Sequence, residues 1–424
     1  MIYNIVIYFV LLGIAIASLF NEKVRKMWRG EREAFKILKQ KVDPNAKYIW
    51  FHAASLGEFE QGRPLMEQIR KDYPQYKILL TFYSPSGYEV RKNYEGADII
   101  CYMPVDTRLN AIRFLRLVRP VMAFFIKYEF WSNFLHILKH RNIPTYSVSS
   151  IFREDQVFFK WYGRSYANVL KCFTRFFVQN EESKRLLESI GIKDVDVVGD
   201  TRFDRVLQIK EAAKHLPICE AFRSGVAGSD SAASSEKASH PDYKVFVAGS
   251  SWPPDEEIFV RFFNEHKDWR LLIAPHVIAE EHLKLILSLL KDKKVVRYTQ
   301  TTPEEAAKAD VLIIDCFGLL SSMYNYGDVA YVGGGFGVGI HNTLEAAVWN
   351  MPVIFGPNNK KFQEALGLLK SGGGFEINTY EDFEGLMKSL MNDEAFLEQA
   401  GDEAGAFVAS LSGATDKVLA KVTL

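Results

Sequence analysis

The 424-residue chain has few cysteines and no net charge. Its four cysteines lie more than 30 residues apart, so none has the paired spacing of a zinc site or a redox motif. Each has apolar or aromatic neighbours, which predicts buried, reduced thiols in a reducing compartment. The 52 basic residues balance the 52 acidic ones, which argues against a general nucleic-acid binder. The cysteines are Cys101, Cys172, Cys219 and Cys316.

Two nucleotide-binding patterns are also missing. The first strand of the chain carries no GxGxxG, and no GxxxxGKS/T loop occurs, so hydride transfer and NTP hydrolysis lose support. The chain has no internal repeat and no coiled-coil heptads. With 48% apolar and 25% charged residues, it is not a disordered chain.

The zero net charge conceals two oppositely charged halves. Residues 1–21 carry no charged side chain. Residues 22–205 contain 32 Lys/Arg and 22 Asp/Glu, a net of +10, whereas residues 206–424 contain 20 and 30, a net of −10. Such a separation of charge indicates different neighbours for the two halves.

The first 20 residues form one apolar run, interrupted only by Asn4, Gly13 and Ser18. As a helix rising ~1.5 Å per residue, the run reaches about 30 Å, the thickness of a bilayer's hydrocarbon core. Eight basic and three acidic residues follow between Asn21 and Lys41, the reverse of a cleavable signal. The order predicts a membrane anchor with the rest of the chain in the cytoplasm. The alternative is a buried core helix followed by a solvated basic helix.

Two series of short, continuous apolar runs predict two parallel sheets buried on both faces. The runs span residues 48–54, 77–83, 98–104, 121–129, 144–150, 175–180 and 195–199, then 244–250, 269–275, 294–299, 310–315, 329–335 and 352–357. Helical stretches separate them, which predicts an α/β protein with two Rossmann-like domains facing a cleft.

The same pattern predicts the domain limits. We expect a membrane anchor over residues 1–21, an N-terminal domain over 22–205, a linker over 206–243 and a C-terminal domain over 244–424. Within the linker, residues 224–240 consist largely of Ser, Ala and Gly, which predicts a flexible insertion.

Ligands of such sheets bind beyond the carboxyl ends of the strands, which makes Glu58 a first candidate. It follows the first predicted strand and a loop of small residues, and it begins a helix. A carboxylate there can accept a proton from an incoming hydroxyl. A first-turn glutamate stabilised by the helix dipole is the alternative.

A glycine-rich run over residues 333–339 is a second candidate, because its backbone can approach a ligand closely. Asn342-Thr343-Leu344-Glu345 then starts a helix whose NH groups can hold a phosphate, while Glu345 accepts from ribose hydroxyls. A plain capping box, with Asn342 at the N-cap and Glu345 at N3, is the alternative.

Further candidates lie at other strand ends. Pro275-His276 and Phe317-Gly318-Leu319 are placed to flank a nucleotide base, or are ordinary strand-to-helix turns. Lys127 and Arg202 bring cations to strand ends of the first domain, or pair structurally with Glu129 and Asp204. The aromatic stretch 151–166 is either an acceptor or membrane face or core packing of Phe158, Phe159 and Trp161.

Taken in order, these segments resemble the Kdo transferases, which add 3-deoxy-D-manno-octulosonic acid (Kdo) to the lipid A precursor. The resemblance runs from the N-terminal anchor to about residue 360. The family pattern H-x-x-S-x-G-E is His52 to Glu58, E-x-W-x-N is Glu129 to Asn133, N-E-E is Asn180 to Glu182, and the ending H-N-x-L-E is His341 to Glu345; Ala248-Gly249-Ser250 and Gly356-Pro357 accompany them.

The resemblance implies a GT-B glycosyltransferase of lipopolysaccharide synthesis that uses CMP-Kdo without a metal or other cofactor. It places the enzyme at the inner membrane, with a lipid A precursor (lipid IVA) as acceptor and no nucleic-acid partner. It implies Glu58 as general base and Arg202 as the cation facing the transition state, with Lys127 at the catalytic centre. The implied CMP contacts are Pro275, His276, Phe317, Gly318, Leu319, Asn342, Thr343, Leu344 and Glu345.

Several positions depart from the family pattern. Lys127 stands where a second glutamate is usual, and Arg202 where a lysine is usual. His276 replaces an arginine, Phe317-Gly318-Leu319 replaces Met-Gly-Glu, and Ile340 replaces a glycine. A histidine is a weaker and pH-dependent phosphate partner. A UDP-sugar-dependent GT-B enzyme acting on a lipid-linked acceptor and a non-catalytic membrane-tethered nucleotide sensor are the alternative functions.

Overall fold

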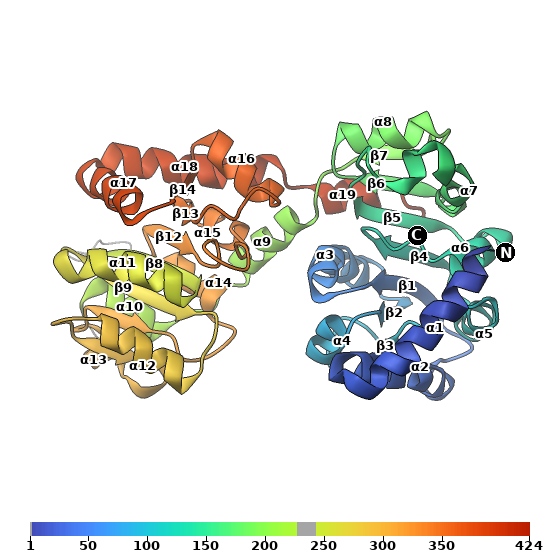
Figure 1. Ribbon diagram of the computed structural model, residues 1–424, viewed down its shortest axis with the longest axis horizontal. Helices are drawn as coiled ribbons and strands as arrows, with labels where there is room; N and C mark the ends of the chain where they lie inside the picture. The colour runs from blue at the N-terminus through green and yellow to red at the C-terminus, as the bar shows by residue number, and fades with distance from the viewer. Residues whose placement is uncertain (1, 227–242) are drawn as a thin grey trace. The chain divides into compact units, whose positions relative to one another are not determined.

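The computed structural model describes residues 2–226 and 243–424, which form two compact units (Figure 1). The first unit contains residues 1–205 together with 411–424, and the second contains residues 206–410. The expected limits are therefore corrected in two places. Residues 206–226 belong to the second unit rather than to a linker, and the last 14 residues return to the first unit. The predicted insertion at 224–240 falls almost wholly outside the described residues.

The first unit is built on a seven-stranded sheet in the order β3-β2-β1-β4-β5-β6-β7, and every neighbouring pair is parallel. All seven predicted apolar runs form these strands. The strands are β1 (Lys47–Ala53), β2 (Tyr76–Phe82), β3 (Ile99–Tyr102), β4 (Met122–Ile126), β5 (Thr145–Ser150), β6 (Arg175–Val178) and β7 (Val195–Val197).

Side-chain alternation along β1 decides what each face of this sheet packs against. Ile49 and Phe51 face the cluster that contains Phe59. Trp50 faces the other way, and its ring lies 4.8 Å from the ring of Phe114. The helices of this unit are α1 (Ile2–Phe20), α2 (Glu22–Lys41), α3 (Leu56–Asp72), α4 (Pro85–Arg91), α5 (Arg108–Val118), α6 (Ser132–His140), α7 (Arg164–Ala167), α8 (Glu181–Ser189) and α19 (Ala414–Leu419), with short 3₁₀ turns at Val157–Phe159, Trp161–Gly163 and Leu170–Cys172.

The apolar helix α1 is long and apolar enough to cross a membrane, by length and composition alone. Its window Tyr3–Phe20 has a mean hydropathy of 2.2, and only 6% of that window is buried. The start of α1 nevertheless contacts the domain, because the Tyr3 hydroxyl donates to the Asp106 carboxylate at 2.6 Å. The Asn133 amide also donates to the Asn4 side chain at 2.8 Å.

Some aromatic residues of the stretch 151–166 are packed in the core, and others are exposed as an acceptor or membrane face would require. Phe158 is buried in the core of the first unit, as core packing requires. Trp161 is 82% exposed, and Tyr162 is exposed beside it.

The four cysteines are free thiols, and three of them are buried as predicted. These three are Cys101, Cys172 and Cys219, whereas Cys316 is only partly buried.

The second unit repeats the parallel architecture with the strand order β10-β11-β9-β8-β12-β13-β14. Its strands are β8 (Lys244–Ser251), β9 (Trp269–Pro275), β10 (Val295–Arg297), β11 (Val311–Ile313), β12 (Val329–Val332), β13 (Val353–Phe355) and β14 (Gly374–Glu376), of which only the three-residue β14 lies outside the predicted runs. Helix α9 (Arg202–Glu211) carries the chain from the first unit into the second. The helices that follow are α10 (Pro217–Ser224), α11 (Pro253–Glu265), α12 (Glu280–Leu289), α13 (Pro303–Ala306), α14 (Leu320–Met323), α15 (Leu344–Ala347), α16 (Gln363–Ser371), α17 (Tyr380–Asn392) and α18 (Glu394–Ser410). Short 3₁₀ turns lie at Tyr298–Gln300 and Tyr324–Tyr326.

Each sheet has one point where the strand order reverses direction. In the first sheet the chain runs outward from β1 to β2 and β3, then returns to place β4 on the other side of β1. In the second sheet β8 and β12 hold the equivalent positions. The carboxyl ends of these two strand pairs are therefore the places where each unit can bind a ligand.

Asp204 attaches the C-terminal segment to the first unit. Its carboxylate accepts from the Gly413 NH at 2.5 Å and from the Thr415 NH and hydroxyl, both at 2.7 Å. The segment then buries Ala414, Val418 and Val422 in the same cluster as Phe59. Asp204 is thus a structural anchor of the tail.

We expect Asp204→Ala to destabilise the first unit by about 1–3 kcal/mol, because it leaves donors of the tail unsatisfied. Thermal unfolding of the full chain measures the effect. Asp402→Ala, which removes the same charge from an exposed position on α18, is the matched control. Equal melting temperatures for the two variants would show that the tail does not depend on Asp204.

Candidate functional site

Glu58 lies at the carboxyl end of β1, in the first turn of α3. Its Oε2 accepts from the Ala54 NH at 2.6 Å and from the Ser55 NH at 3.1 Å, while the Ser55 hydroxyl accepts from the Glu58 NH at 3.5 Å. This reciprocal pair is a capping box, so the structural interpretation of Glu58 holds. Both bonds use Oε2, and no described residue donates to Oε1. The side chain therefore keeps one oxygen for another proton.

The surroundings of Glu58 raise its pKa above that of an ordinary glutamate. Burial raises the pKa of Glu58, and the negative charge of Glu129 raises it further. The hydrogen bond from Ala54 and the positive charges of His52 and Lys127 lower the pKa, but the first two effects prevail. A carboxylate with a raised pKa holds an abstracted proton better than an ordinary glutamate does.

Glu129, just after β4, is held in place by the indole NH of Trp131 and by a ring nitrogen of His52. The Trp131 indole NH donates to Glu129 Oε2 at 2.6 Å, and His52 Nε2 lies 3.1 Å from the same oxygen. His52 Nδ1 lies 2.8 Å from the Thr81 hydroxyl, which fixes the orientation of the ring. Because β1 pairs with β4, this network and Glu58 share the reversal point of the first sheet.

Lys127 occupies the residue directly after β4 with a φ of 62°, in the left-handed region that few residues other than glycine adopt. Its NH donates to the Val148 carbonyl at 2.9 Å, and its carbonyl accepts from the Ser150 hydroxyl at 2.9 Å. These bonds hold the strained backbone in place. The charge of Lys127 also lowers the pKa of Glu58, so the structure brings these two expected site residues together.

Arg202 forms an ion pair with Asp200. Its Nε and Nη2 each lie 2.9 Å from Asp200 Oδ2, and Gln61 donates to the other oxygen at 2.8 Å. The expectation that Arg202 pairs with Asp204 is wrong, because the Asp204 carboxylate binds Gly413 and Thr415 instead. The guanidinium of Arg202 is thus held by a buried aspartate, which fixes its direction.

The glycine-rich run follows β12, at the reversal point of the second sheet. A Cβ on Gly333 would collide with the Ser250 carbonyl, and a Cβ on Gly335 would lie 2.5 Å from the Gly356 backbone. Gly334 has a φ of 93°, and its NH donates to the buried Asp255 carboxylate at 2.9 Å. The protein's own backbone therefore requires these glycines, so glycine density by itself does not indicate a ligand here.

The helix start after this run is not a capping box, contrary to the alternative interpretation. Thr343 holds the N-cap position without a capping bond from its side chain. Asn342 instead accepts from the Leu344 NH at 3.1 Å and donates to Glu345 Oε1 at 3.0 Å. The Thr343 hydroxyl is fully buried and has no hydrogen-bond partner among the described residues.

Sequence reasoning missed a stack of three rings beside this run. The ring of His276 lies 4.8 Å from that of Trp252 and 4.3 Å from that of His341, and the Trp252 indole NH donates to His341 Nε2 at 3.2 Å. Burial and the neighbouring His276 lower the pKa of His341 to about 4, and burial lowers the pKa of His276. Both rings are therefore neutral at pH 7. In the sequence, the position of Trp252 directly after the strand β8 was the feature that could have indicated this stack.

The remaining candidates lie at neighbouring strand ends. Pro275 ends β9, and the His276 NH donates to the Ser251 carbonyl at 2.9 Å, which joins this turn to the end of β8. Phe317 follows β11 and is 80% exposed, while Gly318 has a φ of 83° with open space around it. Phe317 thus offers an uncovered ring face.

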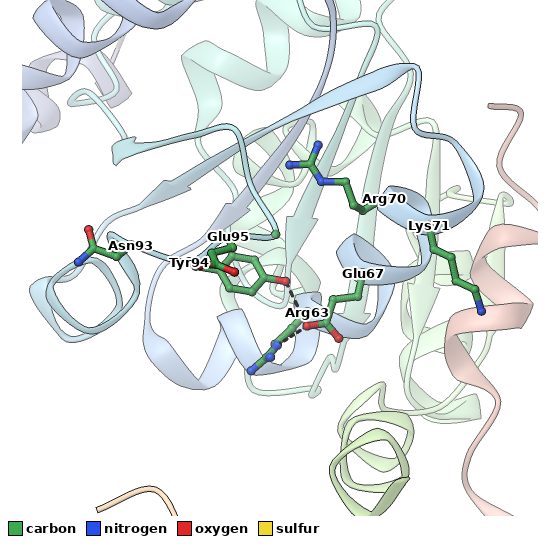
Figure 2. Close-up of a pocket in the computed structure, with 8 residues that line it drawn as sticks. Arg63, Glu67, Arg70, Lys71, Asn93, Tyr94 and Glu95 are labelled. Atoms are coloured by element: carbon green, nitrogen blue, oxygen red, sulfur yellow. Dashed lines mark hydrogen bonds and ion pairs between the residues drawn. The ribbon is translucent and has the colours of Figure 1, made fainter. Parts of the chain in front are cut away.

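A pocket of 520 Å³ lies elsewhere in the first unit, between the end of α3 and the loop before β3 (Figure 2). Figure 2 shows Arg63 directed at Glu67, and both arginines of this pocket are paired with acids. Arg63 Nε donates to Glu67 at 2.6 Å, and Arg70 binds Asp98 at 2.9 Å. This pocket is at the amino ends of the strands, opposite the reversal point. Within residues 2–226 and 243–424, no group of three His, Cys, Asp or Glu side chains is placed to hold a metal ion.

Comparison with known proteins agrees with the resemblance seen in the sequence. The family model "3-Deoxy-D-manno-octulosonic-acid transferase (kdotransferase)" matches residues 29–205. The chain is 26% identical over 392 residues to a 3-deoxy-D-manno-octulosonic acid transferase of Haemophilus influenzae, covering 89% of this chain and 86% of the relative. It is 27% identical over 337 residues to one of Aquifex aeolicus, covering 78% and 82%.

Solved structures show the fold. A UDP-GlcNAc 2-epimerase of Neisseria meningitidis bound to UDP-GlcNAc has a TM-score of 0.58 and 15% identity, covering 88% of this chain and 98% of the other. MurG of Acinetobacter baumannii has a TM-score of 0.52 and 12% identity, with coverages of 88% and 98%. The predicted GT-B fold, with two parallel-sheet domains, is confirmed.

The glycine contacts predict different costs within one loop. Gly335→Ala should lower the free energy of unfolding by about 1–3 kcal/mol, because its new methyl group meets backbone that cannot move aside. Gly337→Ala, where nothing lies within 4 Å of the new methyl group, should change it by less than about 0.5 kcal/mol. Denaturant unfolding measures both, and equal losses would refute the backbone explanation.

Proposed function

Since the chain is a glycosyltransferase of the Kdo transferase family, we propose that it transfers Kdo from CMP-Kdo to a hydroxyl of the lipid A precursor lipid IVA, in lipopolysaccharide synthesis. The observation that carries the proposal is the position of Glu58. The family pattern His52 to Glu58 lies at the carboxyl end of β1, where the strand order reverses, and Glu58 Oε1 accepts no hydrogen bond from the described residues. This is where a parallel sheet presents residues to a ligand.

The first unit supplies the groups that act on the acceptor. Glu58 takes the proton of the attacking hydroxyl as the oxygen forms a bond to the anomeric carbon of Kdo. The bond from that carbon to the CMP phosphate breaks in the same inverting step, so the bonding electrons leave with the phosphate. Arg202, oriented by Asp200, stabilises the charge that develops, and Lys127 binds the donor carboxylate or phosphate. The step as proposed uses no metal.

The second unit supplies the donor site. Phe317 offers an exposed ring for the cytosine base, and Pro275, Gly318 and Leu319 line the same strand ends. Glu345, bonded to Asn342, accepts from ribose hydroxyls, while Asn342 and Thr343 provide NH groups near the phosphate. His276 is neutral at pH 7, so it serves as a hydrogen-bond partner of CMP rather than as a charge.

The membrane role rests on α1. Its uncharged, largely exposed surface and the net charge of +10 over residues 22–205 suit a chain held against anionic lipid, with the sheet domains in the cytoplasm. The test of the whole proposal is transfer of radiolabelled Kdo from CMP-Kdo to lipid IVA by the full chain. No transfer, together with no CMP binding, would overturn it.

A UDP-sugar transferase on a lipid-linked acceptor is the second candidate. It is favoured by the fold likeness to a structure bound to UDP-GlcNAc and by the departures at His276 and Leu319 from the family's CMP-binding pattern. Competition separates the two, because the proposed donor site should bind CMP more tightly than UDP.

We expect Glu58→Gln to bind CMP normally and to lose transfer by about 10²–10⁴-fold, the usual size of general-base catalysis. The amide oxygen of glutamine still caps α3, so the fold should persist. Because the pKa of Glu58 is raised, the acid limb of the wild-type kcat/KM profile should lie above the pKa of an ordinary glutamate. Glu95→Gln, an exposed change of the same kind, is the control. Full turnover by Glu58→Gln would remove Glu58 from the mechanism.

We expect Glu345→Ala to weaken CMP binding by about tenfold or more, since it removes a charged acceptor worth about 1.5–3 kcal/mol. Calorimetric titration with CMP measures the loss, with Glu398→Ala on the exposed face of α18 as control. A variant with unchanged CMP affinity and a lower melting temperature would assign Glu345 to the helix start alone.

A further inference from the structure

A second pocket, of 340 Å³, lies in the first unit among α1, α2 and α5. Leu11 of α1 supplies one wall, and the other lining residues come from α2, from α5 and from Val105 in the loop before α5. The residues that give it chemical character are Trp28, Glu31, Arg32, Asn110 and Arg113.

The two arginines of this pocket are positioned by aromatic rings rather than by acids. The Arg32 guanidinium lies 5.2 Å from the Trp28 ring centroid, and that of Arg113 lies 4.5 Å from the Phe35 ring centroid. Among the described residues, no carboxylate lies within 4.0 Å of either guanidinium. Stacking of this kind leaves the NH groups at the guanidinium edge available, and their fork matches the oxygens of a phosphate.

Glu31 gives independent evidence of a ligand. The side chain lines the pocket and is 4% exposed, and neither carboxyl oxygen has a hydrogen-bond partner among the described residues. Buried polar atoms without partners are rare and call for an explanation. Burial raises the pKa of Glu31 to about 8, so at pH 7 the group is a carboxylic acid with a proton to donate. Two guanidinium edges and one acid proton together suit an anion with several oxygens.

The position of α1 indicates where such an anion comes from. Both ends of α1 are tied to the rest of the unit: Tyr3 donates to Asp106, and Arg25 donates to the carbonyls of Ser18 and Leu19 at 2.9 and 2.7 Å. The start of a helix that crosses a bilayer lies about 30 Å from a domain on the other side, which the Tyr3 contact does not permit. Phe9, Leu12, Leu19 and Phe20 are exposed along the same helix.

A helix held flat in this way buries its apolar side among lipid acyl chains and keeps its other side at the level of the headgroups. The pocket beside Leu11 then lies at headgroup level. We propose that the pocket among α1, α2 and α5 binds the phosphate group of a membrane lipid headgroup, with Arg32 and Arg113 on its oxygens and Glu31 donating a hydrogen bond. The assignment is independent of the sugar that the enzyme transfers.

Vesicle flotation with the full chain tests the proposal. One set of vesicles contains phosphatidylcholine with phosphatidic acid, and the other contains phosphatidylcholine with cholesteryl hemisuccinate at equal negative charge but without an added phosphate monoester. The wild-type chain should float preferentially with phosphatidic acid. Equal flotation with both sets would overturn the proposal, since charge alone would then explain the binding.

Paired variants separate the pocket from general electrostatics. Arg32→Gln with Arg113→Gln should lower partition onto phosphatidic acid vesicles by about tenfold or more and abolish the preference for phosphate. Lys36→Gln with Arg116→Gln removes the same charge from exposed positions on the same two helices, and it should weaken both vesicle types alike while keeping the preference. Indistinguishable double variants would overturn the proposal.

Two further measurements use variants of Glu31 and a soluble competitor of the lipid phosphate. Glu31→Gln keeps a donor and should retain the phosphate preference, whereas Glu31→Ala should reduce it with an intact melting transition. If Glu31→Gln abolishes binding, the group acts as an ionised carboxylate toward a cation and the assignment is wrong. Inorganic phosphate at millimolar concentration should not displace the chain from phosphatidic acid vesicles, and displacement would identify a site for free phosphate instead.

Discussion

The parallel hydrogen bonding of β1 with both β2 and β4 is the constraint on which the first unit depends. Parallel neighbours require a crossover for every connection, so each strand ends at the same edge of the sheet and each helix starts there. The crossovers after β1 and β4 place the residues that follow both strands beside each other at that edge. Glu58, Lys127 and Glu129 meet for this reason, and the same constraint brings Trp252 and the glycine-rich run together in the second unit.

The groups that suit catalysis also hold the local structure together. One oxygen of Glu58 closes a capping box while the other remains open, and the same burial that fixes the helix start raises the pKa of the carboxyl. The buried Asp200 fixes the direction of the Arg202 guanidinium, and the glycines after β12 leave room for neighbouring backbone of the protein itself. Structural and functional interpretations of these residues are therefore compatible, because a group can act on a ligand with precision only when its surroundings already fix its position.

The separation of charge along the chain has a physical counterpart in the first unit. Its excess of basic residues includes Arg32 and Arg113, which face a pocket beside the apolar α1 and stack on rings rather than pairing with acids. Guanidinium groups are less strongly hydrated than ammonium groups, so they tolerate such a partly apolar setting. The acidic excess lies in the second unit, where the expected nucleotide contacts are backbone NH groups, exposed rings and neutral histidines.

Much of the fold was determined by the sequence itself. Thirteen apolar runs became strands because a strand covered on both faces must be apolar throughout, a property that each short segment carries alone. The family patterns likewise placed Glu58, Arg202 and the 342–345 turn at strand ends. Only the tertiary structure decided that Asp204 holds the C-terminal tail, that Trp252, His276 and His341 stack, and that most of the loop glycines serve backbone packing. It also decided that Glu31 is buried with no hydrogen-bond partner among the described residues. Each of these depends on which distant segments come into contact, and no local pattern of residues encodes that choice.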